Sequence, residues 1–289
     1  MIESLRMNHR ENEANYRAHW RRSTVQYLLG ILLASSGGLA SSQPEEVVVT
    51  GTALPLLVTH VEGIVAVNRD NQLTRWNSSL CLRIEGLPAD QHAIIRERLS
   101  HASKKVRISL LKAGCAENVL LFFASNPKEI SQSLAKHFEV PLRQDSTARV
   151  QQFMADRAPV RWITTYDRCG FGCRLANSRI TASSAPAVNF MLLVVDTNQI
   201  RRRRMQDIAE YVAFVVLGNP APHAQPAVHS VLSLFETNAD SSETAGMSIY
   251  DQAYLEALYT LPMDRYIDSQ RNTIGNAMLV RLNEMNMLQ

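Results

Sequence analysis

The stretch Val119-Leu120-Leu121-Phe122-Phe123 decides the fold class, because five consecutive apolar residues leave no side of the backbone for water. A continuous apolar run of this length predicts a strand buried on both faces. Asn126-Pro127 follows it and opens a helix that runs to His137-Phe138, with Pro127 in the first turn, where its missing N–H is tolerated. A strand at 80–84 and a helix at 89–105 precede it. This β-α-β-α order predicts helices packed on a mixed sheet.

A second group of elements follows toward the C-terminus. Strands are predicted at 160–166 and 190–195, and helices at 205–217, 248–259 and 264–285. Gly218-Asn219-Pro220 stops the first of these helices, and Ser248 is the N-cap of the second. Residues 220–246 are predicted to be a long loop with a short apolar anchor at 231–235. We therefore expect one disulfide-stapled α+β domain over 61–289, with two C-terminal helices and a subdivision near 145–155 as an alternative.

Length and composition exclude several classes of protein. The chain has 289 residues, 46% of them hydrophobic and 20% charged, with a net charge of +3. These values exclude wholesale disorder and a protein with many membrane spans. The most basic run, Arg201-Arg202-Arg203-Arg204, is too short to indicate nucleic-acid binding, which needs about six or more phosphate contacts. We expect no nucleic-acid partner.

The N-terminus has the organisation of a secretory signal. Residues 1–22 are polar with several arginines, Val25 to Ala34 are mostly apolar, and 35–42 are mainly small. The apolar part has about 10 residues, fewer than the roughly 20 that a spanning helix needs. We predict a signal peptide over 1–40, cleaved after Ala40, and a periplasmic or secreted protein with no membrane span after cleavage. The long basic region leaves two alternatives, a start at Met7 or retention of the segment as an anchor.

The four cysteines, Cys81, Cys115, Cys169 and Cys173, are consistent with export to an oxidising compartment. Three pairings are possible in principle. Cys81 lies in a predicted strand and Cys115 just before another, so neighbouring strands would bring them together, while Cys169-Gly-Phe-Gly-Cys173 is typical of a small loop staple. A zinc site is the alternative, but the one close pair is spaced C-x-x-x-C and the chain has no C-x-x-C cluster to complete such a site. We expect neither a bound metal nor a cofactor.

Residues 41–60 are predicted to be an extended N-terminal segment. Within it, the run from Pro44 to Thr52 resembles the Ton-box of TonB-dependent outer-membrane receptors, where a strand pairs with the edge of a partner's sheet. The resemblance implies a TonB-like partner in the envelope. The partner-binding candidates are Glu46, Val47, Val48, Val49, Thr50 and Gly51. The alternative is an ordinary first strand of β-branched residues.

The C-terminal run from Tyr250-Asp251 to Ala257-Leu258-Tyr259 resembles the helix that follows the Met-turn of metzincin metalloproteases. The best overlay of that family's zinc helix, H-E-x-x-H-x-x-G-x-x-H, is 209–219. It keeps only Glu210, since Ala209, Ala213 and Asn219 replace the three histidines. Because alanine cannot ligate zinc, the resemblance implies a degenerate zincin-like scaffold without its metal. The alternative is an apolar core helix with Glu210 at its solvent edge.

The mature chain also resembles a set of uncharacterised exported bacterial proteins. The shared features are Trp76 and Cys81 before Gly86-Leu87-Pro88, Gly114-Cys115 before Asn118, and the helix from Asp251 to Tyr259. This resemblance brings no known activity with it.

The candidate catalytic residues are Glu210, His223 and His229, the last two lying near each other in the predicted loop. The chain has no G-x-S-x-G elbow, phosphate-binding glycine loop or C-x-x-C pair. We therefore favour a non-catalytic binding or assembly protein of the cell envelope. The alternative is a hydrolase with an atypical, degenerate zincin-like site near Glu210 and the two histidines.

Overall fold

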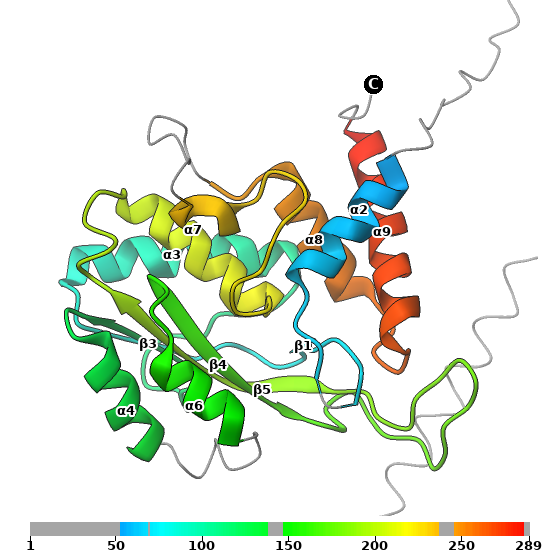
Figure 1. Ribbon diagram of the computed structural model, residues 1–289, viewed down its shortest axis with the longest axis horizontal. Coiled ribbons are helices and arrows are strands. Elements are labelled where there is room, and N and C mark those ends of the chain that lie inside the picture. Colours follow the sequence, from blue (N-terminus) through cyan, green and yellow to red (C-terminus); the bar gives the residue numbers. More distant parts are fainter. Residues whose placement is uncertain (1–52, 69, 138–146, 237–245, 286–289) are drawn as a thin grey trace, which may run out of the picture. The chain divides into compact units, whose positions relative to one another are not determined.

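The computed structural model describes residues 53–68, 70–137, 147–236 and 246–285 (Figure 1). The chain divides into the units Met1–Val47 and Val48–Gln289, and every described residue belongs to the second. In chain order its elements are α2 (Ala53–Ile64), β1 (Arg75–Trp76), β2 (Leu82–Glu85), α3 (Ala89–Lys105), β3 (Val119–Ala124), α4 (Pro127–His137), α6 (Thr147–Ala155), β4 (Val160–Asp167), β5 (Ala187–Asp196), α7 (Met205–Gly218), the 3-10 helix η1 (Val231–Phe235), α8 (Ile249–Thr260) and α9 (Ile267–Glu284).

A mixed sheet forms the centre of this unit. β5 pairs in parallel with β3, from Val119 opposite Met191 to Ala124 opposite Asp196, and nearer its start with the short β1. β2 pairs in parallel with β3. β4 runs antiparallel along the other edge of β5, with an irregularity between Thr165 and Tyr166. The predicted α+β fold with a mixed sheet is confirmed.

Helices cover both faces of the sheet, which explains the uninterrupted apolar runs in β3 and β5. On one face Leu120 and Leu192 pack with Phe153 of α6 and Ala135 of α4. On the other face Leu121 and neighbouring side chains join the larger core that contains the buried face of α7. Figure 1 shows α4 and α6 on one side of the strands and α3 and α7 on the other. A strand sandwiched in this way has no solvent face, so polar alternation is absent.

The helix α2 corrects the predicted extended segment. Residues 53–60 of that segment are helical, so the start of the folded domain at 61 was placed too late. The reason is visible in the burial of Leu57, His60, Val61 and Ile64, which recur at helical spacing and face the core. α2 packs along α9. The rest of that segment, 41–52, lies outside the described residues, as do the predicted signal peptide and the candidates Glu46 to Gly51.

Both predicted disulfides are present. Cys81 is bonded to Cys115, with 5.9 Å between their Cα atoms, and Cys169 to Cys173, with 5.0 Å. Cys81 immediately precedes β2 and Cys115 lies before β3, so the parallel pairing of these strands brings the two together. Among the described residues, none of the helices is both long and apolar enough to span a membrane.

Candidate functional site

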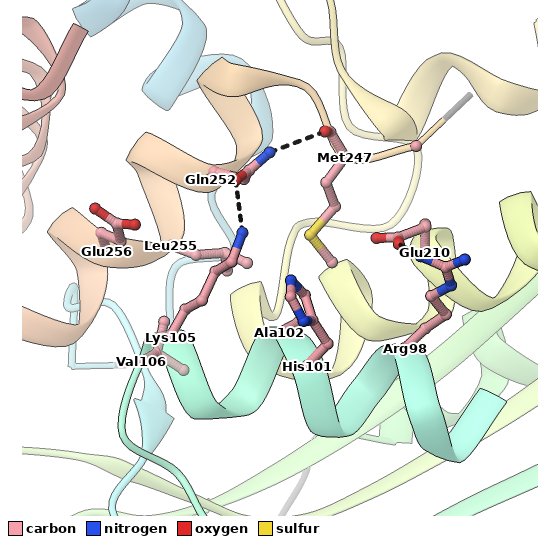
Figure 2. Close-up of a pocket in the computed structure, with 11 residues that line it drawn as sticks. Arg98, His101, Ala102, Lys105, Val106, Glu210, Met247, Gln252, Leu255 and Glu256 are labelled. Atoms are coloured by element: carbon pink, nitrogen blue, oxygen red, sulfur yellow. Dashed lines mark hydrogen bonds and ion pairs between the residues drawn. The ribbon is translucent and has the colours of Figure 1, made fainter. Parts of the chain in front are cut away.

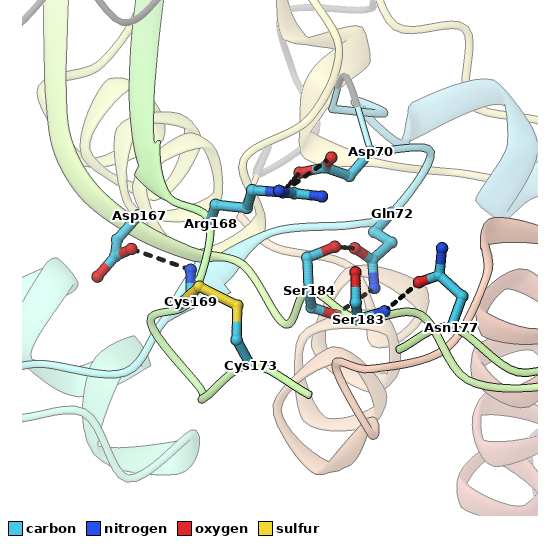
Figure 3. The surroundings of a disulfide bond; sticks show 9 residues. All are labelled: Asp70, Gln72, Asp167, Arg168, Cys169, Cys173, Asn177, Ser183 and Ser184. Carbon is cyan, nitrogen blue, oxygen red and sulfur yellow. Dashed lines mark hydrogen bonds and ion pairs between the residues drawn. A yellow bond between two sulfur atoms is a disulfide. The ribbon is translucent and has the colours of Figure 1, made fainter. Parts of the chain in front are cut away.

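The connection between β4 and β5, residues 168–186, is a long excursion that we call the disulfide loop (Figure 3). The Cys169–Cys173 bond closes a tight turn at its start, where Gly172 has a φ of 100° that disfavours residues with a side chain. Gly170 is equally constrained, because a Cβ there would lie 2.2 Å from the Cβ of Ala187. The base of the loop is therefore held at a defined distance from β5.

A buried amide ties the disulfide loop to two other segments. Gln72 is fully buried, and its Nε2 donates to the carbonyl oxygens of Ser184 at 3.0 Å and Met263 at 2.9 Å. The hydroxyl of Ser184 donates back to the Gln72 Oε1 at 2.6 Å. Because a buried amide is costly to leave unpaired, these bonds fix the loop against the segment between α8 and α9.

A cavity of 460 Å³ lies between the disulfide loop and this segment, and we call it the Arg75 cavity. Its volume is within the range of small-molecule sites, roughly 300–1,000 Å³. It is lined by Arg75, Phe171, Gly172, Cys173, Arg174, Ala182, Ser183, Ser184, Ala185, Leu261, Pro262, Met263 and Asp264. The lining brings together residues that are far apart in the sequence.

Arg75 is the half-buried cation of this cavity. Its guanidinium carbon lies 4.4 Å from the ring centre of Phe171 and 5.3 Å from that of Tyr259. Its Nη2 donates to the Leu261 carbonyl at 3.4 Å, and its Nε is buried without a partner. Burial lowers the pKa of Arg75, which the Tyr259 hydroxyl partly offsets. Among the described residues, no carboxylate forms an ion pair with Arg75.

The other charges of the cavity are already paired. Arg174 donates to Asp264 Oδ2 from Nε at 3.0 Å and from Nη2 at 2.6 Å. Arg265 lies 3.8 Å from the other oxygen of Asp264. The lining thus holds two arginines and one aspartate, and the aspartate's charge is directed to Arg174 and Arg265. This leaves a net positive cavity.

The candidate Glu210 lies in a smaller cavity of 160 Å³ between α3, α7 and α8 (Figure 2). Its carboxylate lies 3.4 Å from Nη1 of Arg98, on α3. Lys105 donates to the Gln252 side chain at 2.8 Å on the other side of this cavity. Glu210 therefore has a cationic partner and lies at a partly exposed edge, as the core-helix alternative expected.

The positions that the metzincin overlay assigns to histidines are structural. Ala209 and Ala213 are completely buried in the core. Asn219 ends α7 in the left-handed conformation, with a φ of 42°, and bonds to Thr164 and Thr74. Within the part of the chain that the structure describes, no three His, Cys, Asp or Glu side chains are grouped so that they could hold a metal ion.

The helix α8, whose sequence resembles the metzincin helix after the Met-turn, also has a structural role. The last carbonyl groups of a helix have no partner within it. Tyr259 donates to the Leu217 carbonyl at 3.2 Å and Tyr254 to that of Gly218 at 3.5 Å, while the indole of Trp76 donates to Val216 at 2.7 Å. The motif residues thus satisfy the carbonyl end of α7.

His223 lies in a third cavity, of 180 Å³, together with Tyr211 and Trp162. Its Nε2 lies 3.3 Å from Oδ2 of Asp156, a carboxylate just after α6. His223 also has a φ of 58°, which is uncommon for a residue with a side chain. The structure does not place Glu210 in this cavity, and the exposed His229 lines neither of the two.

Sequence reasoning missed Arg75, Gln72 and Asp156. Arg75 lies in a strand of only two residues, too short for any periodicity. Asp156 follows α6, which was not predicted. The rings beside Arg75 come from the disulfide loop and from α8, so no local pattern marks this arginine.

Comparison with protein-family models, curated proteins and solved structures finds no match to this chain.

Proposed function

We propose that this chain is an exported, non-catalytic binding protein of the cell envelope that receives a small anionic ligand in the Arg75 cavity. The observation that carries the proposal is the Arg75 guanidinium, which faces a 460 Å³ cavity without a carboxylate partner among the described residues. A partly buried charge without a counter-charge is unfavourable, and a bound anion would remove that cost.

The surroundings of Arg75 favour a carboxylate or phosphate as this anion. The rings of Phe171 and Tyr259 lie 4.4 and 5.3 Å from the guanidinium carbon, and cation–π attraction to them does not use the N–H groups as hydrogen-bond donors. A planar guanidinium presents two parallel donors that match the two oxygens of such a group. Ser183 and the apolar side chain of Met263 also line the cavity and would contact the rest of the ligand.

The compartment in this proposal rests on the N-terminal signal pattern and on the cysteines. All four cysteines are paired, and free cysteines are absent from the chain. Stable disulfides are typical of the periplasm and the extracellular space. An envelope location also agrees with the TonB-like partner proposed for 46–51.

Substitution of Val48 by Pro would abolish capture of this TonB-like partner, and unchanged capture would exclude it.

The hydrolase with a degenerate zincin-like site is the second candidate, and the Asp156–His223 pair favours it. A carboxylate that bonds one imidazole nitrogen orients the ring as a general base. The residues lining that cavity include no serine, threonine or cysteine, so the base would have to activate a water molecule. Loss of a hydrolytic activity in His223→Gln, with anion binding unchanged, would favour this candidate over the binding protein.

The test of the binding proposal compares matched probes. Benzoate and benzamide have the same shape and differ in charge, so we expect millimolar benzoate, or inorganic phosphate, to raise the melting temperature while benzamide does not. Arg75→Met should abolish the rise, measured against the melting temperature of the same variant without ligand, because methionine keeps an apolar contact with the two rings but carries no charge. Arg265→Met, which changes a paired arginine outside the cavity lining, should keep it. Equal shifts in Arg75→Met and in the wild type would contradict the proposal.

A further inference from the structure

The tip of the disulfide loop, residues 174–180, exposes two large aliphatic side chains. Leu175 is 107% exposed and Ile180 67% exposed, the two highest values among the exposed large hydrophobic residues described. The tip is nevertheless ordered by its own bonds. The Arg174 N–H donates to the Ser183 carbonyl at 2.8 Å and the Ser178 N–H to that of Thr181 at 2.7 Å. Figure 1 shows this loop extending away from the sheet beyond the start of β5.

The charged residues of the same loop are all arginines. Residues 168–186 contain three arginines and no aspartate or glutamate. Arg168 pairs with Asp70 at its base, and Arg174 pairs with Asp264. Arg179 is exposed and has no partner among the described residues. The exposed aliphatic residues each follow an arginine directly, as Arg174-Leu175 and Arg179-Ile180.

We propose that this tip docks on an anionic lipid surface, with Leu175 and Ile180 entering the headgroup region and Arg179 contacting lipid phosphates. Aliphatic side chains gain free energy when they leave water for the headgroup–acyl boundary. A basic residue close to an anionic leaflet adds electrostatic attraction to this apolar contribution. The disulfide and the tip hydrogen bonds fix the loop beforehand, which lowers the entropy lost on docking.

The composition of the tip favours a lipid surface over a protein partner. Residues 174–180 contain two arginines and no aspartate or glutamate, so the charge of the tip is complementary to an anionic leaflet. Two aliphatic side chains on a projecting basic turn are suited to a soft, negatively charged surface. This inference rests on exposure and charge at the tip, and occupancy of the Arg75 cavity is not required for it.

Fluorescence of a tryptophan at the tip tests the docking directly. In the full-length chain, Leu175→Trp should show a blue shift of its emission when vesicles of phosphatidylglycerol and phosphatidylethanolamine are added. Vesicles of phosphatidylcholine should give a much smaller shift. The matched control is Val280→Trp, which replaces a 58% exposed residue of α9 and should show no shift. Both sites are exposed, so neither substitution should alter folding.

A cosedimentation measurement adds the contribution of the native side chains. The double variant Leu175→Asn/Ile180→Asn should bind the anionic vesicles at least tenfold more weakly than Val280→Asn. Arg179→Glu should weaken binding at low salt and have little effect at high salt, where lipid charge is screened. Absence of a blue shift at 175, or an equal shift at 175 and 280, would overturn the proposal. Capture of an envelope protein that depends on Leu175, without any vesicle shift, would also overturn it in favour of a protein contact.

Discussion

Asp251 shows how one buried carboxylate holds a loop to a helix. It is fully buried at the start of α8, where Val231 N–H and Ser248 N–H both donate to its Oδ2 at 2.8 Å. The Ser230 hydroxyl donates to its other oxygen at 2.6 Å. Ser248 completes a capping box with it. The loop before η1 is therefore attached to the helix that also satisfies the end of α7.

The two oxygens of Asp251 lead to different expectations for two substitutions. Asp251→Asn should cost about 1 kcal/mol, because its amide oxygen can still accept both N–H groups, whereas the Ser230 hydroxyl, which already accepts the Leu232 N–H, loses the acceptor of its own proton. Asp251→Ala should cost about 3 kcal/mol, because the two buried N–H groups and the hydroxyl lose their acceptor. Urea denaturation of both variants measures the difference. Equal losses would show that the charge itself is required.

At the scale of elements, α2 and α9 approach closely at Gly275. A Cβ at this position would lie 2.8 Å from Cγ2 of Val58, which is too close for two carbon atoms. Gly275→Ala should therefore destabilise the protein by about 1–2 kcal/mol, although alanine favours a helix by about 1 kcal/mol. In a Val58→Ala background the same change should be neutral or stabilising. A double-mutant cycle with no coupling between 58 and 275 would contradict this packing.

The end of α2 is held by the loop that follows α7. The Gln225 N–H donates to the Gly63 carbonyl and the Ala221 N–H to that of Ile64, both at 2.8 Å. His60 is completely buried beside them, and its Nδ1 accepts the Val228 N–H at 3.4 Å. Its Nε2 has no partner in the described part of the chain. Burial lowers the pKa of His60 from 6.5 to about 4.

This pKa gives a defined pH dependence of stability. Because the folded pKa lies below the unfolded one, the unfolded chain binds the proton first as the pH falls. The contribution of His60 is complete above about pH 6.5 and is lost progressively toward pH 4, by about 3 kcal/mol in total. The free energy of unfolding, measured by denaturation at several pH values between 7 and 4, should depend less on pH for His60→Gln than for the wild type. Parallel profiles would exclude His60 as the cause.

At the scale of the whole molecule, the two disulfides should contribute unequally. Cys81–Cys115 spans a sequence separation of 34 and Cys169–Cys173 one of 4. Because the entropy removed from the unfolded chain grows with loop length, we expect replacement of the first pair by serine to cost about 4 kcal/mol and that of the second about 2 kcal/mol. Replacement of the Cys169–Cys173 pair should also weaken anion binding in the Arg75 cavity, because Cys173 lines that cavity. Calorimetry and the benzoate shift on both double variants check this.

Local patterns predicted most of the fold. The strands at 119–124 and 187–196 and the helix α7 have apolar runs long enough to identify from composition and length. The helix α2 was missed because its apolar face was assigned to an extended tail, and α6 because its face contributes only Phe153 as a fully buried residue. Strand adjacency and the two glycines favoured one disulfide pairing, but the sequence left three possible, and the structure decides between them.

The candidate site was less accessible to prediction, because its chemistry depends on contacts between distant residues. Arg75 is distinctive only when Phe171 and Tyr259 lie beside it and no carboxylate does. Glu210 and His223 stood out in the sequence as chemical groups, but the sequence did not indicate that Arg98 lies beside the first and Asp156 beside the second. The position of a polar residue in a sequence motif does not indicate which side chain lies beside it in the fold.

Native mass spectrometry of the protein purified from the cell envelope, without reduction, tests the central claim most directly. We predict the mass of a chain cleaved after Ala40, lower by four hydrogens than the reduced form because of the two disulfides, with no zinc. A co-purified anionic ligand should add its mass to the wild type and be absent from Arg75→Met. An uncleaved chain with free thiols, bound zinc, or an adduct equally abundant in Arg75→Met would contradict an exported binding protein with its site at Arg75.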